Sequence, residues 1–214
     1  MNWKVCGMRD EQNINEVLTL RPNWMGFIFY AKSPRYVVGK LSPSFLQNWS
    51  YPTKKVGVFV NPSVEWLMEQ ATAFKLDIVQ IHGEPLSESF YKELKKANLE
   101  IVQAVGVGEK IDFDELAKLE PLIDYFLFDT KSGSHGGTGQ SFDWDLLNSY
   151  PLSKPFLLAG GICLENFQNL PNWQNIPFWG VDVNSRFEHS PANKNSTTLA
   201  VLSHKIDEFN KHKL

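Results

Sequence analysis

The stretches GFIFY at residues 26–30 and VGVFV at residues 56–60 decide the fold class of this 214-residue chain. Both are continuously apolar, without the alternation of apolar and polar residues that marks a strand with one solvent-facing side. Strands that are buried on both faces have this composition, and parallel sheets covered by helices are their usual setting. The two runs therefore predict a parallel α/β fold.

Similar apolar runs recur along the chain, each followed by a polar or glycine-bearing turn. The predicted strands are Trp3–Cys6, Met25–Tyr30, Lys55–Val60, Ile78–Ile81, Glu100–Val105, Tyr125–Phe128, Pro155–Leu158 and Phe178–Val183. Apolar residues at helical spacing predict helices over Ser42–Trp49, Val64–Ala71, Leu86–Ala97, Phe113–Leu119 and Thr197–Phe209. Before the second of these, Asn61-Pro62 offers an N-cap residue type and a proline suited to the first helical turn.

Eight strands that alternate with helices indicate an α/β architecture, and eight is the number that closes a barrel. The alternative is a doubly wound open sheet. Two observations favour the barrel: the first strand–helix turn lacks a G-x-G-x-x-G fingerprint, and polar candidate residues follow strands throughout the chain. No Pro/Gly/Ser-rich linker divides the chain, so we expect residues 1–214 to form a single (β/α)8 TIM barrel that is the catalytic domain.

The composition argues against several classes of partner. The formal net charge is −3 and no block of Lys or Arg stands out, so nucleic acid is not an expected partner. The chain contains no run of about 18 apolar residues, so no membrane span is predicted. The N-terminus lacks the basic and apolar segments of a secretory signal. The two cysteines, Cys6 and Cys163, are therefore expected to be free thiols in a cytoplasmic protein.

In a (β/α)8 barrel, functional residues lie at the C-terminal ends of the strands and in the loops that follow. These positions hold a thiol, a cation, an imidazole, an acid and two glycine- or serine-bearing turns. The residues are Cys6 after the first strand, Arg35 after the second, His82 after the fourth, Asp129 after the sixth, Gly160 and Gly161 after the seventh, and Ser185 after the eighth.

The turns after the seventh and eighth strands point to a phosphorylated small molecule. Glycine lets backbone N–H groups approach an anion closely, and barrels often bind phosphate through these two loops. Gly160-Gly161 and Ser185 occupy these places. A tight turn without a ligand is the alternative for a Gly-Gly pair, and the position of the pair favours the phosphate interpretation.

Six segments of the chain resemble, in order, the signature segments of phosphoribosylanthranilate isomerases. They are KVCGM at residues 4–8, GFIFY at 26–30, KSPRY at 32–36, VQIHGE at 79–84, GGTG at 136–139 with FDW at 142–144, and LAGGI at 158–162. Each segment is modest evidence alone, but six in register make a specific resemblance.

The resemblance implies a barrel that performs an Amadori rearrangement of N-(5'-phosphoribosyl)anthranilate without a metal or an organic cofactor. It also implies that Cys6 is the general base and that Asp129 is the general acid. The residues implied in substrate binding are Arg35, at the anthranilate end, and His82. The residues implied in phosphate binding are Gly137, Gly160, Gly161 and Ser185.

The rearrangement opens a furanose ring and moves a proton from one sugar carbon to its neighbour. One acid can protonate the ring oxygen, and one base can then remove the proton from the carbon that the resulting imine acidifies. A thiol with a reference pKa of about 8.5 and a carboxyl with one of about 3.9 are both in the wrong state at neutral pH. Cys6 therefore needs an environment that favours the thiolate, and Asp129 needs either a raised pKa or delivery of its proton during closure.

Each of these residues also has a plainer alternative. Cys6 can be a small core residue, and Asp129 can cap the turn that follows it. Arg35 can be a surface cation, and His82 can hydrogen-bond a loop carbonyl. Lys4 lies two residues before Cys6 and so shares its face of the strand, where it either shapes the local charge or is a paired core lysine.

The region after the eighth strand departs from the family pattern. Many family members have Ser-Ser-Gly here, whereas residues 184–186 of this chain are Asn-Ser-Arg. The later Pro-Gly and Lys-x-Asp patterns are represented by Pro-Ala at 191–192 and Lys-Asn at 194–195. Arg186 replaces a glycine and disfavours a positive φ, and we hypothesise that it makes a charged contact with phosphate.

Two other classes of function remain open on the sequence alone. One is a different sugar-phosphate barrel enzyme: a metal-dependent epimerase needs a His/Asp cluster, for which only His82 and Asp129 are candidates. The next synthase of the same pathway needs a strand-end lysine, for which only Lys4 is available. The other class is a non-catalytic binding protein, which needs neither Cys6 nor Asp129. The expected assembly is a monomer or a homodimer.

Overall fold

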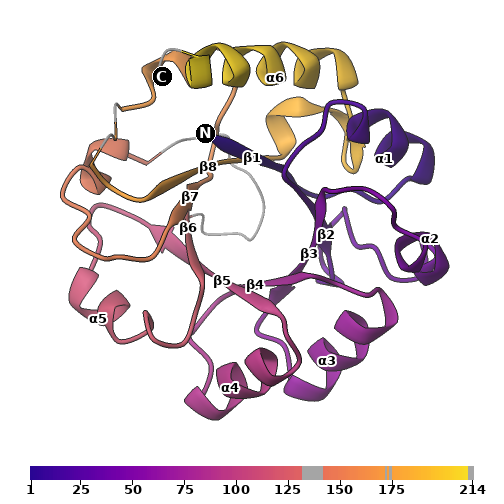
Figure 1. Ribbon diagram of the computed structural model, residues 1–214, viewed down its shortest axis with the longest axis horizontal. Helices are drawn as coiled ribbons and strands as arrows, with labels where there is room; N and C mark the ends of the chain where they lie inside the picture. Colours follow the sequence, from indigo (N-terminus) through magenta and orange to yellow (C-terminus); the bar gives the residue numbers. More distant parts are fainter. Residues whose placement is uncertain (132–141, 172, 174, 212–214) are drawn as a thin grey trace.

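A computed structural model describes residues 1–131, 142–171, 173 and 175–211. Eight strands close into a barrel in the order of the sequence, each parallel to its neighbours, and the first strand pairs with the eighth (Figure 1). The strands are β1 (Asn2–Val5), β2 (Trp24–Ile28), β3 (Lys54–Val60), β4 (Ile78–His82), β5 (Glu100–Val107), β6 (Tyr125–Thr130), β7 (Phe156–Leu158) and β8 (Phe178–Val183). The predicted α/β barrel is confirmed, and the assignment of residues 1–214 to a single domain stays a prediction.

Helices surround the barrel on the outside (Figure 1). They are α1 (Glu11–Leu18), α2 (Pro43–Gln47), α3 (Val64–Ala73), α4 (Glu88–Lys96), α5 (Phe113–Ala117) and α6 (Ser196–Lys211). Within the described residues, the connections after β6 and β7 contain the 3₁₀ turns η1 (Trp144–Leu147) and η2 (Phe167–Asn169) instead of α-helices. Pro171 and Pro177 make the second connection a poor helix former. None of the helices in the described part of the chain is long and apolar enough to cross a membrane.

The predicted strands agree with the structure to within two residues at each end. β1 ends at Val5, so Cys6 begins the turn that follows, whereas β6 continues through Asp129 to Thr130. The sequence analysis did not predict the hairpin that follows the 3₁₀ turn η3 (Ser185–Phe187). Its strands are β9 (Glu188–Ser190) and β10 (Asn193–Lys194).

Helix α1 was also not predicted, although the sequence carries signals for it. Asp10 caps the helix by accepting a hydrogen bond from the N–H of Asn13 at 2.9 Å. Ile14, Val17 and Leu18 are buried on its inner face. The helix has only about two turns, so its apolar pattern is too short to stand out from a loop.

The start of α3 differs from the prediction. Ser63, not Asn61, is the N-cap, and its hydroxyl accepts a hydrogen bond from the N–H of Trp66 at 3.2 Å. Asn61 has a φ of +44°, a left-handed conformation that asparagine tolerates better than most residues. Its backbone N–H donates to the carbonyl of His82 at 3.1 Å. Asn61 therefore joins β3 to β4 instead of starting the helix.

The interior of the barrel is filled with side chains along most of its length. Trp24 packs against Trp179 with ring centroids 4.0 Å apart and against Tyr125 with centroids 4.9 Å apart. Aliphatic side chains that share this cluster are Val56, Ile78, Val102, Leu127 and Leu157. Because the interior is packed in this way, the barrel is a core and not a pore, as is usual for eight-stranded barrels.

Candidate active site

A cavity of about 560 Å³ lies at the C-terminal ends of the barrel strands. All eight strands, or the turns that directly follow them, contribute to its lining. In the order β1 to β8, one lining residue from each strand or its following turn is Cys6, Ile28, Val58, His82, Ala104, Asp129, Gly160 and Asp182. Arg35, Gly161 and Ser185 also line the cavity. The structure therefore brings together all the predicted site residues except Gly137, which lies outside the described residues.

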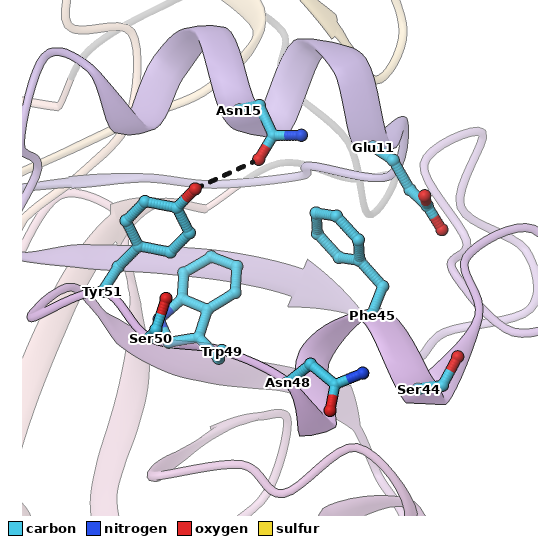
Figure 2. A pocket seen from close by; sticks show the side chains of 8 residues that line it. All are labelled: Glu11, Asn15, Ser44, Phe45, Asn48, Trp49, Ser50 and Tyr51. Carbon is cyan, nitrogen blue, oxygen red and sulfur yellow. Dashed lines mark hydrogen bonds between the residues drawn. The ribbon is translucent and has the colours of Figure 1, made fainter.

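A second hollow, of about 330 Å³, lies between α1 and the chain that follows α2 (Figure 2). It is lined by Phe45, Trp49 and Tyr51 together with polar residues that include Glu11 and Asn15. The hydroxyl of Tyr51 lies 3.5 Å from Asn15 Oδ1. None of the predicted site residues lines this hollow, so the cavity at the strand ends is the candidate active site.

Cys6 is held in place by the strands on either side of it. Its backbone N–H donates to the carbonyl of Val183 in β8 at 2.9 Å, and only 4% of the residue is exposed. A Cβ added at Gly26 of β2 would lie 2.8 Å from Cys6 Sγ and 3.1 Å from Lys4 Cε. Gly26 therefore leaves the room that lets the thiol and the lysine side chain lie next to each other.

Lys4 is fully buried inside the barrel and is paired. Its Nζ donates to Asp182 Oδ2 and to Gln80 Oε1, both at 2.8 Å. Lys4 and Asp182 meet because the closing strand register pairs these two residues directly. Gln80 Nε2 lies 2.6 Å from His82 Nε2, so His82 belongs to the same network. Asp182 Oδ1 is buried without a hydrogen-bond partner among the described residues, and Asp182 lines the cavity.

The environment of Cys6 differs from the one expected from the sequence. Burial is the largest influence and raises the pKa of the Cys6 thiol above its ordinary value. The positive charges of Lys4 and Lys194 act in the opposite direction but do not cancel this effect, because the negative charge of Asp182 adds to it. The thiol is therefore protonated at neutral pH in the free protein.

The environment of Asp129 agrees with the expectation of a protonated acid. Burial raises the pKa of Asp129 to about 6, and the negative charge of Asp182 adds to the effect. The N–H of Thr130, which donates to Asp129 Oδ1 at 2.8 Å, and the charge of Lys4 oppose it. A carboxyl with a pKa near the working pH is suited to act as a general acid.

The raised pKa of Asp129 makes the stability of the protein depend on pH. The pKa is about 6 in the folded state and about 3.8 in an unperturbed carboxyl, so between these values the native state holds a proton that the unfolded state lacks. The stabilisation is therefore fully present below the lower value and is lost as pH rises through the higher one, a change of about 3 kcal/mol. Urea unfolding of the wild type and of Asp129→Asn, from about pH 4 to about pH 8, measures this change. From about pH 4 to about pH 8 the wild type should lose about 2–3 kcal/mol of unfolding free energy relative to the asparagine variant, and a pH-independent difference would contradict the raised pKa.

The turn after β7 contains two glycines in the left-handed conformation, with φ of +81° at Gly160 and +70° at Gly161. A Cβ added at Gly160 would lie 2.7 Å from the backbone nitrogen of Thr130 and 2.9 Å from Asp129 Oδ1. Asn166 supports the turn by donating from Nδ2 to the carbonyl of Gly161 at 3.0 Å. Glycine is therefore required at position 160 both for the backbone conformation and for the close approach to Asp129.

The segment after β8 accommodates the loss of one family glycine, at position 186, whereas Ala192 takes the place of the other glycine with a left-handed φ of +68°. Ser185 starts the 3₁₀ turn η3, and Arg186 does not have a positive φ. The loss of the usual glycine at position 186 therefore introduces no left-handed strain. Both side chains belong to the cavity lining.

Comparison with known proteins identifies the family. Residues 3–204 match the family model described as N-(5'phosphoribosyl)anthranilate (PRA) isomerase. This chain belongs to the PRA isomerase family. A relative from Parabacteroides distasonis, named N-(5'-phosphoribosyl)anthranilate isomerase, is 43% identical over 92% of this chain and 89% of its own length.

Solved structures of PRA isomerases resemble the fold along nearly the whole chain. Monomers of the dimeric phosphoribosylanthranilate isomerase from Thermotoga maritima are 27% identical, with a TM-score of 0.75 and coverage of 96% of this chain and 98% of that one. Another phosphoribosyl anthranilate isomerase was solved in complex with reduced 1-(o-carboxyphenylamino)-1-deoxyribulose 5-phosphate. It is 24% identical, with a TM-score of 0.78 and coverage of 95% and 96%, and at this identity the likeness shows the fold.

Several polar residues of this PRA isomerase site were not assigned from the sequence. Gln80, Glu188 and Lys194 were not singled out, and Asp182 was left without a role. Gln80 is two residues before His82 and so shares its face of β4, a signal that could have found it. Arg35, a partner of Glu188, is 153 positions away in sequence, and Lys194 meets Glu188 through the β9–β10 hairpin, which the sequence analysis did not predict. Within the described ranges, no group of three or more His, Cys, Asp or Glu side chains could hold a metal ion.

Proposed function

We propose that this protein is an N-(5'-phosphoribosyl)anthranilate isomerase. The enzyme would convert N-(5'-phosphoribosyl)anthranilate to 1-(2-carboxyphenylamino)-1-deoxyribulose 5-phosphate, the third step from chorismate in tryptophan biosynthesis. The observation that carries the proposal is that Cys6 and Asp129 line one cavity in a chain of the PRA isomerase family. The pKa of about 6 at Asp129 supports an acid-catalysed ring opening.

In the proposed mechanism, Asp129 first donates its proton to the ring oxygen of the sugar. The bond from this oxygen to C1 breaks with its electron pair staying on the oxygen, and the lone pair of the anthranilate nitrogen forms a protonated, positively charged imine with C1. Cys6, as the thiolate, then removes the proton from C2, and the electron pair neutralises the imine nitrogen to give an enolamine. The aminoketone forms when the C2 hydroxyl proton is lost and C1 is protonated. No bond between substrate and protein is needed.

The proposed base needs help to ionise, because burial raises the pKa of its thiol. The ammonium of Lys4 lies beside Cys6 and opposes this rise. A thiolate next to a buried cation is stabilised relative to one in an apolar pocket. We propose that the charge of Lys4 stabilises the thiolate form of Cys6, which is the form that acts as the base.

The substrate contacts are also part of the proposal. Phosphate is assigned to Gly160, Gly161 and Ser185, supported by their place after β7 and β8 and by the left-handed turn. Arg35 is assigned to the carboxylate of the anthranilate ring and His82 to a further contact with the substrate. Gly137, which lies outside the described residues, remains a sequence-based assignment.

The assembly and the cellular location remain predictions. A monomer or a homodimer is predicted from the sequence, and the Thermotoga maritima relative is described as dimeric. A cytoplasmic location and the absence of nucleic-acid and membrane partners are likewise sequence-based predictions.

The experiment that tests the function is turnover of freshly generated N-(5'-phosphoribosyl)anthranilate, followed by the loss of anthranilate-type fluorescence. EDTA should leave the rate unchanged, because no metal is predicted in the mechanism. A reaction without protein measures the chemical breakdown of the substrate, and Asp129→Asn is the matched variant, in which the protein-dependent rate should fall. A folded wild-type protein without turnover would contradict the proposal and favour a related sugar-phosphate enzyme or a binding protein.

A further inference from the structure

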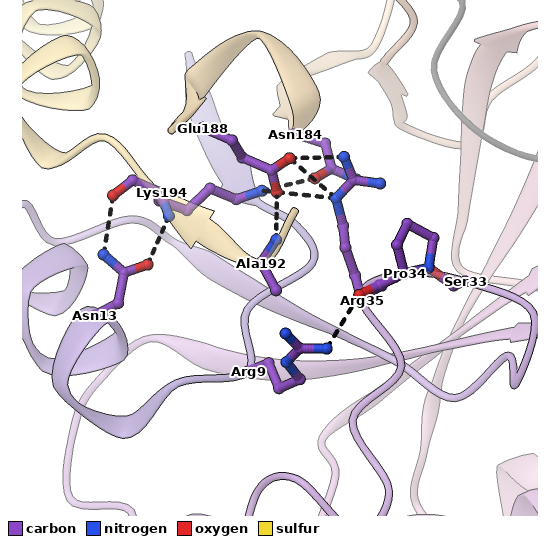
Figure 3. Close-up of polar contacts among 9 residues, drawn as sticks. All are labelled: Arg9, Asn13, Ser33, Pro34, Arg35, Asn184, Glu188, Ala192 and Lys194. Carbon is purple, nitrogen blue, oxygen red and sulfur yellow. Dashed lines mark hydrogen bonds and ion pairs between the residues drawn. The ribbon is translucent and has the colours of Figure 1, made fainter. Parts of the chain in front are cut away.

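A cluster of charged side chains connects the Arg35 loop to the β9–β10 hairpin at the edge of the cavity (Figure 3). Arg35 Nε donates to Glu188 Oε1 at 2.9 Å, and Arg35 Nη2 donates to Glu188 Oε2 at 2.6 Å. Lys194 forms an ion pair with the same carboxylate, through Glu188 Oε1. One carboxylate thus binds two cations.

The cluster is shielded from solvent. The side chains of Arg35, Glu188 and Lys194 are 12%, 4% and 0% exposed. Buried charges are stable only when they are paired and hydrogen-bonded. With two positive charges and one negative charge, the cluster has an excess of one positive charge next to the cavity, so a second carboxylate would balance it.

Among the described residues, the guanidinium of Arg35 has one edge bound to Glu188 and one edge without a hydrogen-bond partner. Its Nε and Nη2 bind Glu188, while Figure 3 shows the third nitrogen pointing away from that carboxylate. A Cβ added at Gly7 would lie 2.5 Å from Arg35 Cδ, so the arginine stem packs directly on the turn that follows Cys6. The planar, five-donor guanidinium can bind one carboxylate on each of two edges.

Lys194 is itself fixed from two sides. The side-chain amide of Asn13 in α1 accepts from the backbone N–H of Lys194 at 2.7 Å and donates to its carbonyl at 2.9 Å. Lys194 Nζ also donates to Asn184 Oδ1 at 2.6 Å. Glu188 accepts a further hydrogen bond from the N–H of Ala192 at 3.1 Å. The carboxylate that binds Arg35 is therefore held rigidly by the hairpin.

We infer that Glu188 and Lys194 are positioning residues that hold Arg35 in the orientation needed to bind a substrate carboxylate, and that they thereby determine selectivity for carboxylated substrates. The inference rests on the proposed function. Neither residue touches the reacting atoms: Glu188 orients the guanidinium, and Lys194 anchors Glu188. A held arginine loses less conformational freedom when it binds than a mobile one, so the carboxylate gains affinity.

The test compares the affinities of two stable ligands for the wild type and for Glu188→Gln by calorimetry. One ligand is reduced 1-(o-carboxyphenylamino)-1-deoxyribulose 5-phosphate, and the other is the same compound without the carboxylate. We expect the wild type to prefer the carboxylated ligand, and Glu188→Gln to lower that preference by about 10–100-fold, the size of effect of a charge-assisted hydrogen bond. Affinity for the ligand without the carboxylate should change little.

The substitution tests positioning and not the amount of charge. Burial lowers the pKa of Lys194 to about 8 even though the charge of Glu188 raises it. Glu188→Gln therefore favours the neutral form of this lysine, and Glu188→Gln/Lys194→Met, which removes one charge of each sign, keeps the net charge of the cluster at one. Glu88→Gln makes the same chemical change in the exposed Glu88–Lys92 ion pair of α4 and should leave the preference unchanged.

Two outcomes overturn the inference: an unchanged preference in Glu188→Gln, or an equal weakening of both ligands, which indicates a purely structural role. If Glu188→Gln does not fold, the double variant Glu188→Gln/Lys194→Met removes the unpaired lysine and is judged by the same ratio. Equal affinity of the wild type for both ligands contradicts this inference and the assignment of Arg35 to the substrate carboxylate, but not the proposed isomerase activity. Binding of neither ligand contradicts the proposed function and this inference with it.

Discussion

Replacing Asp129 by asparagine is expected to lower kcat by about 10²–10⁴-fold, the usual contribution of a positioned general acid or base. Asparagine has nearly the same shape but has no acidic proton to give to the ring oxygen. Its side-chain oxygen can still accept the hydrogen bond that Asp129 Oδ1 receives from Thr130 N–H at 2.8 Å. The loss should therefore come from the missing proton and not from a displaced side chain.

Single-turnover fluorescence of the Asp129→Asn variant is the measurement. Because the cavity is kept, the affinity for the reduced product analogue should stay within a few-fold of the wild type. Cys6→Ala gives the companion result, a similar loss of kcat, and the double variant should be little worse than either single one because the two groups act in one sequence of proton transfers. A folded Asp129→Asn protein with near-normal kcat would remove Asp129 from the mechanism.

Replacing Lys4 by methionine is expected to lower the free energy of unfolding by about 3–5 kcal/mol, the usual cost of removing one partner of a buried ion pair. Lys4 Nζ donates to Asp182 Oδ2 and Gln80 Oε1 at 2.8 Å, so both acceptors lose their donor. Asp182 Oδ1 already has no hydrogen-bond partner within the described part of the chain. Among the described residues, the variant would leave the buried carboxylate of Asp182 without a hydrogen-bonded cation.

Urea unfolding at neutral pH measures the Lys4→Met effect, and Lys4→Met/Asp182→Asn is the matched control. Removing the unpaired charge should restore a large part of the lost stability, because the cost lies in the isolated carboxylate and not in the lost lysine stem. The loss should also shrink at lower pH, since burial raises the pKa of Asp182 and protonation removes the charge. A loss of less than about 1 kcal/mol would show that the pair is not buried as described.

The strands and their places in the barrel could be predicted from the sequence alone. Continuously apolar runs such as residues 26–30 report burial on both faces, which is a local property of the chain. The same holds for the candidate site: Cys6 and Asp129 could be selected because they lie at strand ends, and the fold places all such ends around one cavity. Local pattern therefore decided the architecture and most of the site residues.

Helix boundaries and short elements were predicted less well. Asn61 and Ser63 are both good N-cap residues, and only the backbone shows that Ser63 has the cap while Asn61 is left-handed. Helix α1 and the β9–β10 hairpin are too short for their periodicity to separate them from loops. In these segments several local conformations have similar free energies, and packing against the rest of the barrel selects one.

The charge partners were decided by tertiary structure alone. Lys4 meets Asp182 because the register that closes the barrel sets β1 against β8, and neither strand encodes that register by itself. Arg35 meets Glu188 across 153 positions of sequence, and their pairing requires both the β2 loop and the terminal hairpin to be in place. A sequence specifies which segments are buried and how they run, because burial and backbone preference are properties of short stretches. Which buried charges pair, and hence how the pKa values of Cys6 and Asp129 are shifted, depends on distances between segments that only the closed barrel defines.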